Sequence, residues 1–359
     1  MPLPTSTSVA NLKKIVSRIK GKRIGVLGDL MLDRYLWGTA SRLSPESPVP
    51  VVEFEKQEQF PGGAGNVAAN LVALGARVEA FGVIGATKNA DDGAGGTLRG
   101  CLRELGMDDR GVIADAGRVT TVKTRIIARH QQIVRLDQES RNALGKEVED
   151  KIFRKFADSV KELDGLILSD YDKGVVTDSL SERVFAQCHK GKVPVFVSPK
   201  KPRLFAHRGA RAVTCNLWEA GRFVTHALTD EKSIEEALNN LLSHFGCGAV
   251  VITRGPEGMS LLEEGAKKAL HIPATSFEVT YARVGKAGIE RGAAGRQVFD
   301  VTGAGDTVLS VLAAAVSAGA PVPHAAELAN IAAGIVVGKL GTASVSPQEL
   351  LSDLDHLSR

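Results

Sequence analysis

The sequence predicts an α/β protein with a mostly parallel central sheet that is covered by helices on both faces. Short apolar runs alternate along the chain with segments of helical periodicity, and a glycine often stands where such a segment ends. Two strand-rich stretches interrupt this alternation. With 359 residues, the chain can form one large domain or two ordinary ones, and either buries most of its surface without disulfides or a structural metal.

The expected strands are short and apolar, and the first one ends at Gly28 and Asp29. They cover residues 23–27, 78–84, 166–168, 193–197, 212–214 and 249–253. Between them, apolar side chains recur at helical spacing. The expected helices cover residues 63–74, 95–105, 146–160, 178–189, 233–245 and 307–318. A parallel sheet of this kind binds ligands at the carboxyl ends of its strands.

Two stretches break the alternation of strands and helices. Residues 41–60 contain prolines followed by a strand-like run, and residues 119–137 have strand character with no helix. We expect them to form an antiparallel accessory sheet, a lid over the end of the first strand, covering about residues 36–60 and 117–138. The chain as a whole, residues 1–359, is expected to be a single domain.

Composition and charge narrow the classes of function. A net charge of +4 and an aromatic content of 5% do not indicate a nucleic-acid-binding protein. The four cysteines are scattered without a CxxC pair, which indicates reduced thiols and not a zinc site or a disulfide framework. The first ten residues lack the pattern of a signal peptide, and no apolar run reaches membrane-spanning length. We therefore expect a soluble, cytoplasmic protein.

The turn Gly303-Ala304-Gly305-Asp306 carries the clearest chemical signal. Small residues at a helix start leave its first N–H groups open to an anion, and the helix dipole favours negative charge there. These groups could stabilise a transferred phosphoryl group, and Asp306 could accept the proton of a hydroxyl. The turn is also consistent with an ordinary helix start whose acidic residue complements the dipole. The sequence contains no GxxxxGK[ST], so this is not a P-loop enzyme.

Two further motifs are candidates for sugar contacts. Gly62 and Gly63 precede Asn66 at a helix start, where paired glycines would let a sugar lie against the backbone. Asp29 and Asp33 follow the first strand, and carboxylates there can accept hydrogen bonds from neighbouring hydroxyls. A structural turn is the alternative for the glycines, and helix capping is the alternative for Asp29.

A basic strand is the candidate for phosphate binding. Lys123, Arg125 and Arg129 lie at alternate positions of an expected strand, which places their side chains on one face. Three converging cations form a site for a phosphate that the substrate already carries. The alternative is a solvated sheet edge.

Together these segments resemble the ribokinase, or PfkB-type, carbohydrate kinases, and within them the heptose 7-phosphate kinases of lipopolysaccharide precursor synthesis. The resemblance extends from about residue 20 to the C-terminus. The matching stretches are residues 28–35, 41–52, 62–63, 123–137, 169–174, 253–259, 300–306 and 337–342. The first two of these and the 123–137 segment are specific to the heptose branch.

The resemblance implies a ribokinase-like three-layer α/β/α fold with a small β lid, through which two subunits form a homodimer. It implies ATP-dependent phosphorylation of the anomeric hydroxyl of a heptose 7-phosphate to the 1,7-bisphosphate. Asp306 would be the catalytic base, with an anion hole at Gly303, Ala304 and Gly305. The family is often fused to an adenylyltransferase domain, which is not expected here because the chain ends soon after the kinase motifs.

The resemblance also assigns the ligand contacts. ATP and its Mg²⁺ would be bound by Asn216, Glu219, Thr253, Arg254, Gly255 and Asn330. The sugar phosphate would be bound by Asp29, Gly62, Gly63, Asn66, Lys123, Arg125, Arg129 and Lys173. Relatives hold a monovalent cation such as K⁺ at the positions of Asp300 and Thr302.

Three departures from the family pattern stand near these sites. Ser198 replaces a usual aspartate, Cys215 replaces a usual proline, and the segment 277–296, expected to be a surface loop, is longer than in relatives. Two other functions therefore stay open. One is a kinase of the same family that acts on another sugar or sugar phosphate, and the other is a non-catalytic regulator that binds a sugar or a nucleotide.

Overall fold

The computed structural model describes residues 7–88, 90–128, 131–201, 208–275, 301–339 and 341–357, together with short backbone segments at 284–285 and 288–289. Within the described residues, a nine-stranded sheet forms the centre of the molecule, in the order β13-β12-β11-β10-β9-β8-β1-β4-β5. Its strands are β1 (Arg23–Gly28), β4 (Arg77–Gly85), β5 (Asp108–Asp115), β8 (Gly165–Ser169), β9 (Val195–Ser198), β10 (Ala212–Asn216), β11 (Ala249–Thr253), β12 (Met259–Glu263) and β13 (Leu270–Ile272). The strands from β11 to β5 are parallel, and β12 and β13 add antiparallel pairs at one edge.

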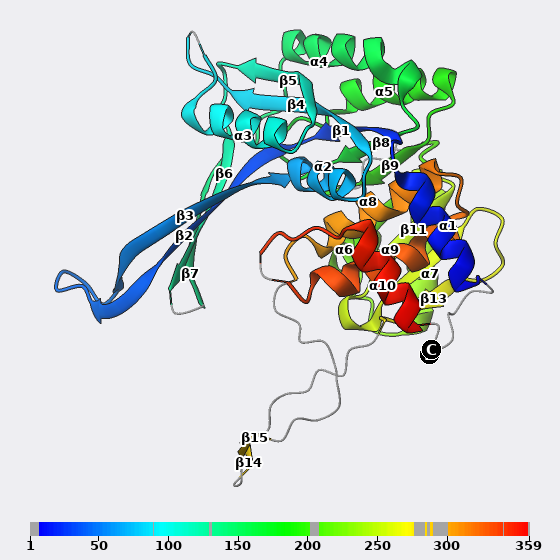
Figure 1. Cartoon of the computed structure of the whole chain (residues 1–359). Helices are drawn as coiled ribbons and strands as arrows, with labels where there is room; N and C mark the ends of the chain where they lie inside the picture. The colour runs from blue at the N-terminus through cyan, green and yellow to red at the C-terminus, as the bar shows by residue number, and fades with distance from the viewer. Residues whose placement is uncertain are drawn as a thin grey trace.

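Helices cover both faces of this sheet, which confirms the predicted fold class (Figure 1). One face carries α1 (Val9–Ile19), α2 (Ala64–Ala73), α3 (Gly93–Glu104), α8 (Ala304–Ser317), α9 (Val322–Val336) and α10 (Pro347–Leu357). The other face carries α4 (Lys146–Ser159), α5 (Asp178–Gly191), α6 (Leu217–Val224) and α7 (Glu231–Phe245).

The strand β11 shows why the sequences of the central strands are unbroken apolar runs. Its side chains alternate between the two faces: Ala249 and Val251 pack into the core beneath α8 and α9, whereas Val250 and Ile252 pack into the core beneath α7. A strand that is buried on both faces needs an apolar residue at every position. Because both faces of the strand are buried, polar side chains are found only where the strand ends, and Thr253 is the last residue of β11.

A second sheet of four strands projects from the body of the molecule (Figure 1). Its order is β3-β2-β6-β7, and its strands are β2 (Leu30–Leu43), β3 (Pro50–Gly63), β6 (Thr121–Ala128) and β7 (Gln131–Gln138). The β2–β3 and β6–β7 pairs are antiparallel, but β2 and β6 pair in parallel. The prediction of a wholly antiparallel sheet was therefore wrong. Both β2 and β6 continue from carboxyl ends of parallel strands, β1 and β5, so they leave the central sheet in the same direction.

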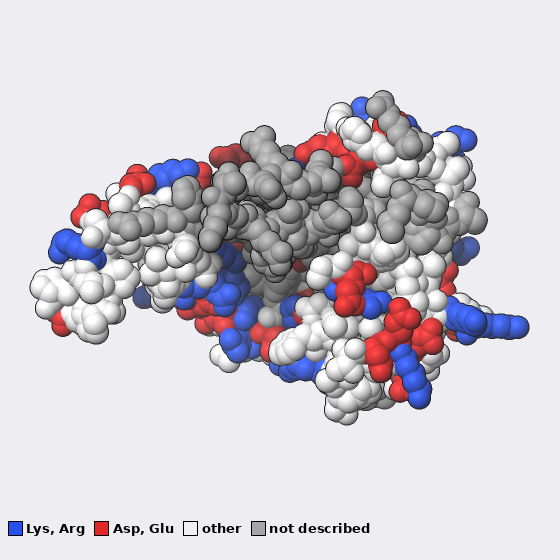
Figure 2. Space-filling model, turned by 90° about the horizontal axis from the view of Figure 1, so that it is seen from below, with Lys and Arg blue, Asp and Glu red and all other residues white. Residues whose placement is uncertain are grey.

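The surface carries both signs of charge. Figure 2 shows the projecting sheet at the left and basic and acidic side chains intermingled over this face of the molecule. Among the described residues, no helix is long and apolar enough to cross a bilayer. The short strands β14 (Val284–Gly285) and β15 (Gly288–Ile289) pair with each other in antiparallel fashion.

Candidate active site

Polar residues gather where the parallel strands end. Asp29 follows β1, Asp170 follows β8, and Ser198, Asn216 and Thr253 are the last residues of β9, β10 and β11. The strand registers align Ser198 with the last residue of β8, and Asn216 with Thr253. These residues therefore lie along one edge of the sheet, the edge at which parallel sheets bind ligands.

The turn at residues 303–306 opens the helix α8, as predicted. Gly303 has a φ of 82°, and a Cβ atom there would lie 2.8 Å from Nδ2 of Asn66. Both the backbone conformation and the lack of space favour glycine. Asp306 stands in the first turn of α8, whose leading N–H groups have no acceptor within the helix.

The carboxylate of Asp306 is fixed by one donor on each oxygen. Asn66 Nδ2 donates to Oδ2 at 2.7 Å, and the Tyr171 hydroxyl donates to Oδ1. Asn66 comes from the first turn of α2, and Tyr171 from the turn after β8. The structure thus brings together the two predicted residues Asn66 and Asp306, and it adds Tyr171, whose role the sequence did not reveal.

The electrostatic surroundings of Asp306 suit a group that exchanges a proton. Burial raises the pKa of Asp306 above its usual value, and the hydrogen bonds from Tyr171 and Asn66 oppose that rise. The positive charge of Lys200 also lowers this pKa, whereas the charge of Asp33 raises it. Burial and the neighbouring carboxylate raise the pKa of Tyr171 well above its usual value, so its hydroxyl remains a donor.

Hydrogen bonds between α2 and α8 hold Asn66 in place. Asn70 Nδ2 donates to the Asn66 carbonyl at 2.9 Å, and the Thr307 hydroxyl donates to Asn70 Oδ1 at 2.9 Å. The Ser310 hydroxyl donates to the Val67 carbonyl at 3.0 Å. The helix that carries Asp306 is therefore bound to the helix that carries its partner.

A cavity of about 390 Å³ lies beside the start of α8. It is lined by two residues of the anion-hole turn, Ala304 and Gly305, and by three residues predicted to bind ATP: Thr253, Gly255 and Asn330. Apolar side chains complete the wall, among them Met259, Val308, Ala333 and Val337. A mostly apolar cleft with a few polar groups is typical of small-ligand sites.

The other residues predicted to bind ATP lie outside this lining. Asn216 and Glu219 form a reciprocal cap on α6: Glu219 N donates to Asn216 Oδ1 at 2.8 Å, and Asn216 N donates to Glu219 Oε2 at 3.0 Å. Lys200 forms an ion pair with the other Glu219 oxygen. Arg254 pairs with Glu257 and donates to the Ser260 hydroxyl at 3.3 Å.

Two of the residues predicted to bind a phosphate, Lys123 and Arg125, stand at alternate positions of β6 and so share one face of it. Lys123 pairs with Asp137 at 3.1 Å, and Arg125 pairs with Asp33. Lys173, from the turn after β8, pairs with Glu139 at 2.7 Å, and Glu139 also lies 3.9 Å from Lys123. Lys123 and Lys173 thus meet at Glu139, and a carboxylate accompanies each of the three described cations.

Asp33 occupies the position between the basic strand and the paired glycines. It is buried, it pairs with Arg125, and a Cβ atom on Gly62 would lie 2.3 Å from its Oδ2. Gly62 therefore leaves the room that this carboxylate fills. Asp33 aligns with Lys123 in the lid register. The sequence indicated Asp33 as a candidate for sugar contacts, because it stands four residues after Asp29 at the end of the first strand. The spacing alone did not show which of the two carboxylates faces the lid.

Asp29, which was predicted to contact the sugar, is hydrogen-bonded to backbone N–H groups of the protein itself. Its side chain is 1% exposed, and its carboxylate accepts hydrogen bonds from backbone N–H groups of residues 171, 173 and 175. Gly63 ends β3 in contact with this region, because a Cβ atom there would lie 2.6 Å from the Asp29 carbonyl oxygen. Arg129 and Asp300, together with most of the segment 277–296, lie outside the described residues. Thr302 lies in the turn before α8.

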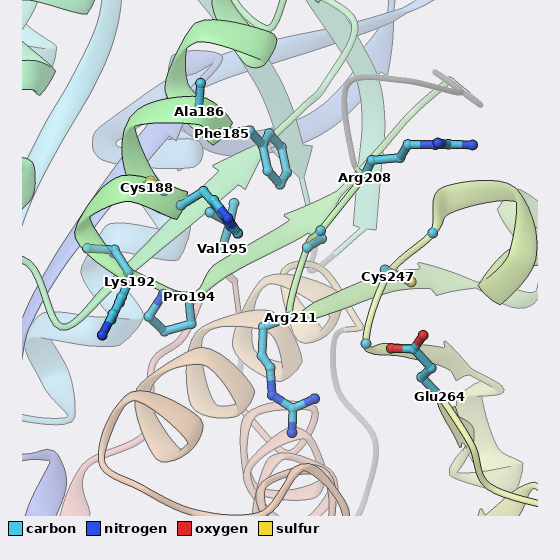
Figure 3. Close-up of a pocket in the computed structure, with 16 residues that line it drawn as sticks. Phe185, Ala186, Cys188, Lys192, Pro194, Val195, Arg208, Arg211, Cys247 and Glu264 are labelled. Carbon is cyan, nitrogen blue, oxygen red and sulfur yellow. The ribbon is translucent and has the colours of Figure 1, made fainter.

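A larger cavity, about 740 Å³, lies at the opposite edge of the sheet, beside the amino ends of β9, β10 and β11 (Figure 3). No residue predicted from the sequence to bind ligand lines it. The labelled charged side chains Lys192, Arg208, Arg211 and Glu264 extend in different directions in Figure 3. The geometry thus favours the cavity beside α8 as the active site.

A comparison with protein families shows which family the chain belongs to. Residues 22–349 match the family described as pfkB family carbohydrate kinase. The chain belongs to the pfkB family of carbohydrate kinases. The match covers the central sheet, the projecting sheet and α8, and it makes the chain an ATP-dependent carbohydrate kinase.

Curated relatives in the pfkB family extend beyond this chain. The chain is 44% identical over 329 residues to the bifunctional protein HldE of Geobacter sulfurreducens, covering 92% of this chain and 62% of that protein. It is 41% identical over 345 residues to the bifunctional protein HldE of Geotalea uraniireducens, covering 96% of this chain and 65% of that protein. The chain thus spans just under two thirds of the length of these relatives.

Solved structures of other kinases share the fold. Escherichia coli phosphofructokinase-2 in complex with potassium superposes with a TM-score of 0.69 at 17% identity, over 95% of this chain and 100% of that one. Arabidopsis thaliana ribokinase complexed with ribose and ATP superposes with a TM-score of 0.67 at 17% identity, over 93% of this chain and 99% of that one. The likeness confirms the ribokinase-like fold.

Proposed function

We propose that this pfkB-family kinase transfers the γ-phosphoryl group of ATP to the anomeric hydroxyl of a heptose 7-phosphate, forming the 1,7-bisphosphate and ADP. The observation that carries the proposal is the position of Asp306. Its carboxylate lies at the start of α8, beside the 390 Å³ cavity, and it faces Asn66 and Tyr171. Lys123 on the lid strand β6 and Lys173 in the turn after β8 would supply the phosphate contacts.

Asp306 acts as the general base in this proposal. The anomeric hydroxyl gives its proton to Asp306 while its oxygen bonds to the γ-phosphorus, and the bond from that phosphorus to the bridging oxygen of ADP breaks. Each carboxylate oxygen has two lone pairs, so Asp306 can accept this hydroxyl in addition to Asn66 and Tyr171. The N–H groups of residues 303–305 stabilise the negative charge on the transferred group.

The nucleotide would occupy the cavity beside α8, with its base against the apolar wall and its phosphates toward Gly305. Mg²⁺ would neutralise the charge of those phosphates. The described residues contain no group of three or more His, Cys, Asp or Glu side chains able to hold a metal. Mg²⁺ would be held mainly by nucleotide phosphates and water, with Glu219, in the first turn of α6 after β10, as the proposed protein carboxylate. Asp300 and Thr302 remain the residues proposed for K⁺.

A second candidate is a kinase of the same family for a sugar that carries no phosphate. The observation that favours it is the pairing of the lid cations. Arg125 already has Asp33 as its partner, and Lys173 has Glu139. A substrate phosphate must compete with these carboxylates, whereas the hydroxyls of a free sugar could hydrogen-bond to them.

We also propose that two copies of the chain associate through the lid. The strands of this sheet expose large apolar side chains: Phe54 and Leu136 are each 66% exposed. Exposed apolar side chains on a projecting sheet are typical of interaction surfaces. Sedimentation of the purified protein measures the resulting state of association.

The test of function is a coupled ADP-release assay on a panel of phosphorylated and free sugars. We expect heptose 7-phosphate to give the highest kcat/KM, well above that of the same heptose without its phosphate. Equal turnover of both would favour the second candidate. ADP release that no sugar stimulates would reject kinase activity on sugars and would favour a regulator.

A further inference from the structure

The buried carboxylate of Asp29 organises the turn between β8 and α5. Its Oδ2 accepts the backbone N–H groups of Tyr171 at 2.7 Å and Lys173 at 3.1 Å, and its Oδ1 accepts that of Val175 at 3.1 Å. The turn is irregular, because Asp172 has a φ of 58°. Asp172 N donates instead to Asp170 Oδ1 at 2.8 Å, so Asp29 serves the N–H groups of residues 171, 173 and 175, which would lose these hydrogen bonds without it.

This turn delivers two side chains to the site. The Tyr171 hydroxyl donates to Asp306 Oδ1. Lys173 Nζ lies 2.7 Å from Glu139 Oε2, at the basic face of the lid. Both Lys173 and Glu139 have side chains only 12% exposed, so their positions are well defined by packing. One buried carboxylate therefore fixes the contacts of both ends of the site.

Tyr171 completes the orientation of the catalytic carboxylate. Asn66, from α2, holds Oδ2 of Asp306, and a single bond would still allow the carboxylate to rotate about χ2. A second donor on Oδ1 fixes its plane. The other charged groups that face Asp306 are Lys200, which lies 5.2 Å from the centre of the Tyr171 ring, and Asp33 from the lid.

We infer that Asp29 and Tyr171 form one positioning unit for the catalytic base: Asp29 holds the turn, and Tyr171 holds the Asp306 carboxylate in its reactive orientation. Asp29 then affects the sugar phosphate through Lys173 and not by direct contact. This inference rests on the proposed function, because it takes Asp306 as the base, and it goes beyond that function by assigning roles to two residues outside the reacting groups.

The test compares kcat and KM as functions of pH for the wild type, Tyr171→Phe, Asp29→Asn and the double variant. Tyr171→Phe removes only the hydroxyl. We expect its kcat to fall roughly tenfold, since misplacing a reacting group by about 1 Å can cost 10²-fold. Because the lost hydrogen bond stabilised the ionised carboxylate, the acid limb of kcat/KM should move to higher pH. The KM for ATP should stay unchanged.

Asp29→Asn should lower kcat and move the acid limb in the same direction, and it should also raise the KM for the sugar phosphate through Lys173. The double variant should have the kcat of Asp29→Asn alone, because the two residues act as one unit. Asp164→Asn is the matched control. Its carboxylate accepts the Arg23 N–H at 2.9 Å at the opposite edge of the sheet, and its loss should leave kcat and the acid limb unchanged.

Two results would overturn the inference. One is an unchanged acid limb and kcat in Tyr171→Phe, which remains decisive even if Asp29→Asn does not fold. The other is a folded Asp29→Asn whose KM for the sugar rises while kcat and the acid limb stay at wild-type values, the behaviour of a direct sugar ligand. The proposed function fails separately, when wild type releases no ADP with any sugar or when Asp306→Asn keeps full activity.

Discussion

The side-chain amide of Asn66 donates to Asp306 Oδ2 at 2.7 Å across 240 residues of sequence. The two residues stand in the first turns of α2 and α8, and these helices pack side by side on one face of the sheet. The contact joins the paired-glycine motif, which ends the lid strand β3, to the turn that opens α8. This contact holds the Asp306 carboxylate, whose ionisation decides how the activity of this kinase depends on pH.

Activity should depend on the ionisation of Asp306. Burial raises the pKa of this carboxyl above its usual value, and a general base must be ionised to accept a proton. Turnover should therefore be lost as the pH falls through this raised pKa, at a higher pH than an exposed aspartate would give. The pH dependence of kcat/KM measures it, and an acid limb at or below about 3.9, the ordinary aspartate value, would contradict it.

Removal of the positive charge of Lys123 or Lys173 should weaken binding of the phosphorylated substrate. Lys123→Ala or Lys173→Ala deletes a charge-assisted contact of about 1.5–3 kcal/mol, so the KM for the sugar phosphate should rise roughly 10- to 100-fold. The KM for ATP should not change. Lys151→Ala, which removes an exposed ion pair with Glu147 on α4, is the control. An unchanged KM in both lid variants would show that the substrate phosphate binds elsewhere.

Narrowing the cavity beside α8 should affect the nucleotide alone. Ala333 on α9 lines this cavity, and Ala333→Leu would place three more carbon atoms in it. We expect the KM for ATP to rise at least tenfold, equivalent to about 1.4 kcal/mol, with little change in the KM for the sugar phosphate. Isothermal titration with a non-hydrolysable ATP analogue checks the result. Equal binding to both proteins would place the nucleotide outside this cavity.

The buried Asp29 should make stability depend on pH. Burial, and to a lesser extent the charge of Asp170, raise the pKa of Asp29 from 3.8 to about 6, against the effect of three backbone hydrogen bonds. The native state then holds this proton more tightly than the unfolded state, so the contribution is full below pH 4 and is lost as the pH rises through 6. At 1.36 kcal/mol per pKa unit, the loss is roughly 3 kcal/mol.

The asparagine side chain of the Asp29→Asn variant cannot titrate. The variant therefore separates the contribution of Asp29 to the pH dependence of stability from the contributions of other groups. Urea unfolding at pH 4 and pH 7 should show that the substitution costs roughly 2 to 3 kcal/mol less at pH 7 than at pH 4. Asp164→Asn serves again as the control at the opposite edge. The same cost of Asp29→Asn at both pH values would mean that Asp29 has an ordinary pKa in the native state.

Much of the fold was predictable because its signals are local. Runs such as β11 are apolar at every position, which indicates a strand buried on both faces, and the helices between them repeat their apolar positions. The parallel pairing of β2 with β6 was not predictable from either segment. The pairing is parallel because β2 follows β1 and β6 follows β5, and β1 and β5 run in the same direction in the central sheet. That common direction is a property of the folded sheet and cannot be seen in either segment alone.

The residues of the candidate site also carried local signals in the sequence. Asp306 and its glycines form a contiguous motif at a helix start, and the basic residues of β6 follow the period of a strand. Tyr171 gave no comparable signal, since its role comes from a contact with a residue far away in the sequence. Asp33 had a signal in its position after β1, but its pairing with Arg125 came only from the tertiary structure. Asp29 had a signal in its position after β1, but a strand end exposes some carboxylates and buries others. Only the tertiary structure shows that its oxygens are occupied by backbone N–H groups.

The central claim is that Asp306 is the general base of a sugar kinase. It is tested most directly by the kcat of Asp306→Asn in the coupled ADP-release assay with heptose 7-phosphate, after ATP binding has been shown to be intact. The amide keeps the size of the carboxylate and one of its two acceptor atoms, but it cannot take up the proton. We expect kcat to fall roughly 10²- to 10⁴-fold with ATP affinity near that of the wild type. A variant that folds, binds ATP and retains the wild-type kcat would contradict the claim.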